Sequence, residues 1–129
     1  MDFFINKNST LPILKMKLIT DDEIDYQSFN ELLKNCAITF SMVNTENNTY
    51  KIANKEGLLI INENPNKFSN QHEFYIGYNW GDNDTNKTGT FIGEFKIDFI
   101  DAQCKTLIVP IKEKLYIHIE DSITKSEFV

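Results

Sequence analysis

The oxygen-rich loop at residues 82–86 is the segment whose residue types most resemble a metal site. Asp82, Asp84 and Asn86 place oxygen side chains at alternate positions, as the first half of a calcium-binding loop does. Such a loop needs a glycine at its sixth position and a bidentate carboxylate at its twelfth, but this chain lacks the glycine and has Gly93 at the twelfth. A turn in which Asp and Asn side chains bond their own backbone explains the same residues. We therefore predict a polar turn, with no metal and no cofactor.

The two histidines offer little for catalysis. His118 lies on a predicted strand whose inward positions are apolar, which directs its ring toward solvent beside Tyr116, and His72 lies in a long loop. The sequence has no nucleophile-elbow serine, no His-Glu metal pair and no Gly-rich phosphate loop. We therefore expect a protein that is not an enzyme, with no catalytic residue.

Two cysteines, Cys36 and Cys104, could in principle form a disulfide. Cys104 lies in a polar turn, and Trp80 does not sit between the two cysteines in the core context that antibody domains show. Two reduced thiols in a protein made in the cytosol are the favoured interpretation.

The elements that must position these residues are mostly β-strands. Apolar and polar residues alternate with a period of two in many short segments separated by polar turns, which is typical of an all-β sandwich or barrel. A capping box from Ser28 to Glu31 predicts one short helix. Residues 54–57 and 101–103 are expected as hairpin turns. The predicted strands are residues 14–18, 38–42, 50–53, 58–61, 74–80, 90–100, 106–109 and 114–119.

The length of 129 residues fits a single domain. We expect one β-sandwich over residues 1–129, with residues 1–10 as an N-terminal arm or edge strand and residues 121–129 as a C-terminal tail. No signal peptide or membrane span is visible in the sequence.

One segment, residues 78–99, combines a strand end, a polar turn and a long strand in an unusual order of residue types. The alternation directs Tyr78 and Trp80 inward together with Phe74 and Ile76. The residues that define the order are Tyr78, Trp80, Asp84, Thr85, Gly89, Phe91, Glu94 and Phe95, here called the 78–95 motif.

The 78–95 motif resembles the N-terminal immunoglobulin-like domain of phage baseplate upper proteins, where an aromatic pair, an Asp-Thr turn and a Gly-Thr-aromatic strand start occur together. The resemblance extends to Leu11-Pro12 and to the segment from Asp101 to Pro110, whereas the helix at residues 26–35 departs from the family. It implies an immunoglobulin-like antiparallel β-sandwich, for which the alternation predicts seven to eight strands and the capping box predicts one short helix. It also implies a tailed-phage virion protein, made in the bacterial host cytoplasm.

The net charge of −6 and the absence of arginine exclude the basic surface that nucleic-acid binding requires. We expect no nucleic acid and no membrane as partners. The expected partners are other virion proteins, contacted in many copies or as a homo-oligomer through edge strands, arm and tail.

The leading alternative is a carbohydrate-binding β-sandwich that attaches to a host surface. Such a module uses exposed aromatic rings as sugar platforms, and Trp80, Tyr78 and Tyr75 are the clustered candidates. The inward direction predicted for Tyr78 and Trp80 argues against a flat platform there.

Overall fold

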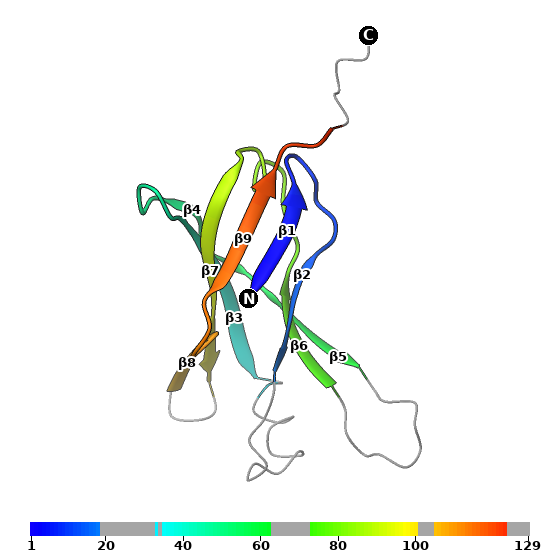
Figure 1. Cartoon of the computed structure of the whole chain (residues 1–129). Helices are drawn as coiled ribbons and strands as arrows, with labels where there is room; N and C mark the ends of the chain where they lie inside the picture. Colours follow the sequence, from blue (N-terminus) through cyan, green and yellow to red (C-terminus); the bar gives the residue numbers. More distant parts are fainter. Residues whose placement is uncertain (19–32, 34, 63–72, 101–104, 124–129) are drawn as a thin grey trace.

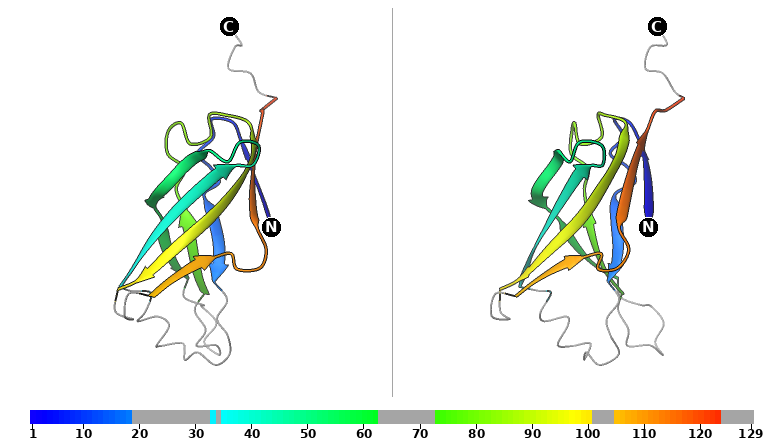
Figure 2. Two further views of the ribbon diagram at one scale, coloured as in Figure 1. Left: turned by 90° about the vertical axis from the view of Figure 1, so that its left-hand side faces the viewer. Right: turned by 60° about the vertical axis from the view of Figure 1, so that its left-hand side comes forward.

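The computed structural model describes residues 1–18, 33, 35–62, 73–100 and 105–123. Nine strands form in this part of the chain: β1 (Asp2–Asn6), β2 (Leu14–Leu18), β3 (Cys36–Asn44), β4 (Tyr50–Glu56), β5 (Leu58–Asn62), β6 (Glu73–Tyr78), β7 (Gly89–Phe99), β8 (Lys105–Val109) and β9 (Leu115–Glu120). The order in the larger sheet, sheet A, is β1-β9-β7-β3-β4, and β8 also pairs with β7. Sheet B has the order β2-β6-β5. The two sheets face each other as the layers of an all-β sandwich, as predicted (Figures 1 and 2).

The sandwich is mixed, which corrects the expectation of a wholly antiparallel arrangement. β1 pairs with β9 in parallel, from Asp2 opposite Tyr116 to Asn6 opposite Glu120. The other strand pairs among the described residues are antiparallel. The described strands also number nine instead of seven to eight. The difference arises because β9 gives the first residues of the chain a free edge on which to form a strand.

The core lies between the two sheets and follows the alternation of the strands. On β7, Phe91, Phe95 and Ile97 are buried, whereas Glu94 and Lys96 are exposed on the outer face. Position 93, on the buried face of β7, is occupied by glycine. A Cβ there would stand 2.9 Å from the ring of Phe40 and 2.6 Å from Cδ1 of Ile117. The close approach of these two side chains over β7 therefore requires a glycine.

The predicted hairpin turn at residues 54–57 is wrong, because the chain changes sheets there. Lys55 and Glu56 still pair with β3, opposite Phe40 and Thr39. β5 then pairs with β6 in sheet B, so β4 and β5 follow each other in nearly one line across the sandwich (Figure 1). Gly57 fits this crossing because a Cβ would stand 2.8 Å from Cγ2 of Ile38.

Several expected features lie outside the described residues. These are the helix from Ser28, the long loop with His72, the turn at residues 101–103, Cys104, and the tail beyond residue 123. Leu33, at the end of the expected helix, is described and is buried. Among the described residues, no helix is long and apolar enough to cross a membrane.

Candidate functional site

The carboxylate of Asp84 is the buried polar centre of the 78–95 motif. Its Oδ2 accepts hydrogen bonds from the Tyr78 hydroxyl at 2.6 Å and from the Gly81 amide at 2.6 Å. Its Oδ1 accepts a bond from Lys55 Nζ at 2.9 Å. Because Asp84 is 3% exposed, these donors replace water almost completely. The residue thus joins the turn to β6 and to β4.

These contacts shift the pKa values of both partners. Burial raises the pKa of the Asp84 carboxyl, but hydrogen bonds from Tyr78, Lys55 and Gly81 outweigh burial and hold that pKa below its ordinary value of 3.8. Burial and the carboxylate raise the pKa of the Tyr78 phenol. At neutral pH the carboxylate is therefore charged and the phenol neutral, which is the combination that the hydrogen bond requires.

Thr85 and Trp80 tie the turn to the segment between β1 and β2. The Thr85 hydroxyl donates to the Ser9 carbonyl at 2.8 Å, and the Asn8 amide donates to the Thr85 carbonyl at 2.9 Å. The indole of Trp80 donates to the Pro12 carbonyl at 3.1 Å. The motif therefore holds the connection that leads from sheet A to sheet B.

The loop at residues 82–86 has the geometry of a turn. Asp84 directs both carboxylate oxygens to protein donors, as described above. Asn83 adopts a positive φ of 71°, a conformation that Asn tolerates in turns. Within the described residues, no group of three or more His, Cys, Asp or Glu side chains is placed to hold a metal ion. The contacts of Asp84 support the polar-turn interpretation over a calcium loop.

The remaining motif residues belong to the scaffold. Phe91 and Phe95 are buried in the core, and Glu94 is exposed on the outer face of sheet A. Gly89 begins β7 with a φ of 147°, which favours glycine. Tyr78 and Trp80 are also buried, as their alternation predicts, with their rings 5.4 Å apart in an edge-to-face arrangement. None of these aromatic rings forms an exposed sugar platform.

Aromatic and aliphatic side chains gather on the outer face of sheet A, in a set that we call the aromatic row. Tyr50, Val43, Ile92 and Tyr116 lie directly opposite one another across β4, β3, β7 and β9. Phe4 on β1 lies opposite His118 on β9 and continues the row. Phe4 is 57% exposed and Tyr50 is 68% exposed, and the residues between them are half-buried. The row is therefore an accessible surface that crosses five strands.

His118 organises one end of the row. Its Nε2 lies 2.8 Å from Oδ1 of Asp2, its Nδ1 lies 3.3 Å from the Thr90 hydroxyl, and its ring stacks on Phe4 with centroids 4.7 Å apart. The hydrogen bond from His118 lowers the pKa of the Asp2 carboxyl. His118 faces outward near Tyr116, as the alternation predicts, and connects β1, β9 and β7.

The sequence indicates a solvent-facing His118 beside Tyr116 and gives Tyr75 as a candidate for a sugar platform, but it does not reveal the row. Strand parity gives Tyr116 as an outward residue, but Tyr50 has the same parity on β4 as the buried Ile52. A register shift in the pairing of β3 with β4, next to Val43, brings Tyr50 opposite Val43 and so into line with Tyr116. Tyr75 lies apart from the row, on sheet B, where the Lys15 ammonium lies 4.7 Å from the centre of its ring.

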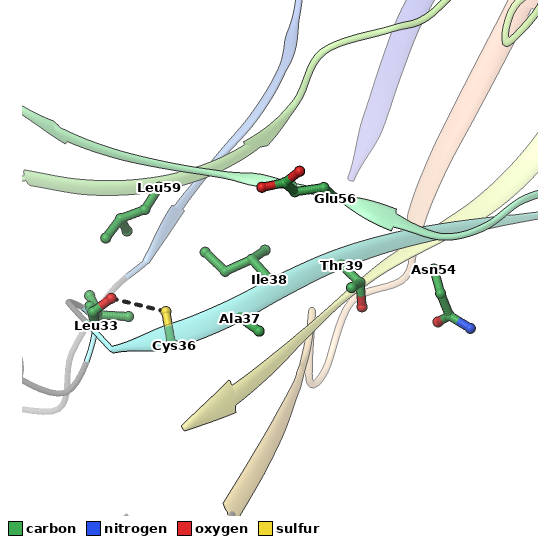
Figure 3. A pocket seen from close by; sticks show the side chains of 9 residues that line it. Leu33, Cys36, Ala37, Ile38, Thr39, Asn54, Glu56 and Leu59 are labelled. Carbon is green, nitrogen blue, oxygen red and sulfur yellow. Dashed lines mark hydrogen bonds between the residues drawn. The ribbon is translucent and has the colours of Figure 1, made fainter. Parts of the chain in front are cut away.

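A pocket of about 510 Å³ opens on the side of the sandwich where β4 leads into β5, and we call it the open flank (Figure 3). Leu33, Ile38 and Leu59 line its apolar part, and Thr39, Asn54 and Glu56 line its polar part. The Cys36 thiol donates to the Leu33 carbonyl at 3.0 Å and is free. Burial raises the pKa of this thiol, which favours its protonated, unreactive form.

Comparison with protein-family models, with curated proteins and with solved structures gives no match. The function of the chain must therefore be inferred from three features described here: the Asp84 turn, the aromatic row and the open flank.

Proposed function

We propose that the protein is a non-enzymatic structural component of a tailed-phage virion, which docks onto other virion proteins through the aromatic row. The order of residue types in the 78–95 motif supports the virion assignment. The contacts of that motif support a scaffold role, because they join the turn, both sheets and the β1–β2 connection. The docking surface then lies elsewhere, on the outer face of sheet A.

The observation that carries the proposal is the exposure of large apolar side chains along the row. Phe4 and Tyr50 expose more than half of their surface at its two ends. The row crosses five strands, so it spans about 19 Å at the usual spacing between neighbouring strands. Aromatic residues are enriched in the cores of protein interfaces, and burying such a row would remove apolar area from water.

A carbohydrate-binding module is the second candidate. The aromatic row changes which rings would bind the sugar. Tyr78 and Trp80 are buried, so a sugar would lie on Tyr116, His118 and Phe4 instead. Asp2 and Thr90 flank these rings with polar groups that could bond sugar hydroxyls. This combination of stacked rings and neighbouring oxygens is the specific observation that favours the alternative.

Substitution of the row tests the docking role. Mass spectrometry of purified virions from the phage that carries the gene should detect the chain, and Phe4→Ser with Tyr50→Ser should reduce its incorporation. Ile111→Ser is the matched control, because Ile111 is also an exposed large apolar residue but lies outside the row. Virions that lack the chain, or equal loss of incorporation in the control, would contradict the proposal.

A glycan array distinguishes the second candidate. Strong binding to particular glycans that Tyr116→Ala abolishes would favour carbohydrate recognition over protein docking. Trp80→Phe serves as a control for the original platform, because Trp80 is buried and its ring is not available to a sugar.

A further inference from the structure

Within the described residues the two sheets end in five edge strands, and four of them carry features that discourage pairing with another chain. β8, for example, begins with Lys105 and is followed directly by Pro110. β2 has lysines at positions 15 and 17, and β1 begins with Asp2. β4 carries Lys51, Lys55 and Glu56, and its pairing with β3 has two register shifts. Charged side chains and bulges are common devices that protect sheet edges.

β5 is the exception among these edges. Its sequence, Leu58-Leu59-Ile60-Ile61-Asn62, has no charge and no proline. It pairs with β6 in one continuous register, from Leu58 opposite Gly77 to Asn62 opposite Glu73. None of the described residues pairs with its other side, where sheet B ends. β5 is therefore a regular, apolar edge with backbone groups available to another strand.

The surroundings of β5 also leave apolar surface uncovered. Ile61 has the same inward parity as Leu59, since both lie opposite core residues of β6, yet Ile61 is 40% exposed. The open flank lies directly beside β5, with Leu59, Ile38 and Leu33 in its wall (Figure 3). A strand added next to β5 would place inward side chains along this flank and reduce the exposure of Ile61.

We propose that the occupant of this edge is β5 of a second copy of the chain, paired antiparallel about a two-fold axis. In the register centred on Ile60, that residue lies opposite itself, and Leu59 lies opposite Ile61 of the partner copy. The product is a continuous six-stranded sheet with the order β2-β6-β5-β5-β6-β2. Such a pairing is isologous, so one surface serves both copies.

Self-pairing at β5 avoids the like charges that two copies would meet elsewhere. The chain carries a net charge of −6, which opposes the approach of two copies over most of their surface. Pairing of β2 with itself about Met16 would place Lys15 opposite Lys17 of the other copy, and like charges directly opposite destabilise a strand pair. The β5 pairing brings no charged side chain opposite another. A contact based on one strand is small, so the dimer should be weak and concentration-dependent.

Sedimentation velocity on the full chain measures this association. The wild-type chain should shift from monomer to dimer as its concentration rises from about 10 μM to about 1 mM. Ile60→Lys should weaken the association by at least about tenfold, because the two substituted lysines would lie directly opposite each other at the two-fold axis. Ile111→Lys is the matched control, since Ile111 is an exposed isoleucine that lies outside the strands and far from β5 in the sequence. It should associate as the wild type does. A wild-type chain that stays monomeric, or an unchanged Ile60→Lys variant, would overturn the proposal.

Cysteine cross-linking is a second test, and it does not depend on whether a lysine in β5 disturbs folding. In a background where Ser replaces both native cysteines, Ile60→Cys should form a disulfide-linked dimer under mild oxidation, because directly opposed Cβ atoms lie about 4.5–5.5 Å apart. Ile111→Cys should cross-link far more slowly. Equal rates at the two positions would refute β5 pairing. Both measurements use the isolated chain, so their outcome does not depend on the proposed virion role, and the row variants should leave the dimer intact.

Discussion

The hydroxyl of Tyr78 donates a 2.6 Å hydrogen bond to the buried carboxylate of Asp84, six residues further along the chain. This bond fixes the polar turn against the last residue of β6. The same carboxylate also receives the Gly81 amide and the Lys55 ammonium, so one side chain joins a turn and two strands. The stability of the sandwich should therefore depend strongly on Asp84.

Replacing Asp84 with Ala should lower the free energy of unfolding by roughly 2–3 kcal/mol. The change removes three hydrogen bonds to a charged acceptor and leaves the buried Tyr78 hydroxyl without its partner. Urea unfolding followed by circular dichroism measures the effect. Asp82→Ala is the control, because Asp82 is exposed in the same turn, and it should change stability by less than about 0.5 kcal/mol. Equal losses in the two variants would show that Asp84 has no special role.

Asp84 should also make the protein less stable in acid. Its pKa is lower in the folded state than the ordinary value of 3.8, so the folded state binds the proton less readily than the unfolded chain does. The stabilisation is fully present above pH 3.8 and is lost as the pH falls from there through the folded-state pKa. Unfolding free energies measured in this range should decline less steeply for Asp84→Asn than for the wild type. An identical decline would assign the acid sensitivity to other groups.

Calcium should not bind the loop at residues 82–86 with micromolar affinity. Both oxygens of the Asp84 carboxylate already accept protein hydrogen bonds, and a metal would have to displace them. Isothermal titration calorimetry with calcium chloride should give only the heat of dilution. Saturable micromolar binding that Asp84→Asn abolishes would contradict the polar-turn interpretation.

Replacing Gly93 with Ala should destabilise the core by about 1–3 kcal/mol through overpacking. The added Cβ would meet the ring of Phe40 at 2.9 Å and Cδ1 of Ile117 at 2.6 Å, so at least one of them must move. Thermal or urea unfolding measures the loss. Glu94→Ala, at the next position on β7 but on the exposed outer face, should have a much smaller effect. A neutral Gly93→Ala would show that these side chains relax freely.

Replacing His118 with Ala should raise the pKa of the Asp2 carboxyl toward its ordinary value of 3.8, since the hydrogen bond from His118 is the main cause that lowers it. An NMR titration of the Asp2 carboxyl carbon in both proteins measures the change. Thr90→Val removes the other partner of the ring without touching Asp2 and should leave most of the shift in place. A wild-type Asp2 that already titrates normally would contradict the contact.

Local alternation predicts much of the core, because the pleat of a strand sorts side chains whatever its neighbours are. Phe91, Phe95 and Ile97 share one parity along β7 and are buried, and Tyr78 and Trp80 are buried as expected. The polar turn follows from the tendency of Asp and Asn to bond nearby backbone and side-chain groups. These inferences require only a few consecutive residues.

Features set by distant neighbours could not be predicted in this way. Gly57 resembles a hairpin glycine in the sequence, but its role depends on the close approach of Ile38. The parallel pairing of β1 depends on the free edge of β9. The alignment of Tyr50 with Tyr116 in the aromatic row depends on register across four strands, which the parity of a single strand could not predict.

The parallel pairing of β1 and β9 also determines how the domain bears tension. Met1 lies beside Lys114 at the start of β9, whereas Asn6 pairs with Glu120 at its end. A force that pulls on residues 1 and 120 in opposite directions therefore runs along both strands. It loads their five register pairs in shear, together, instead of opening them one after another from a single end. A module linked into an assembly through these two strands would resist extension along that axis.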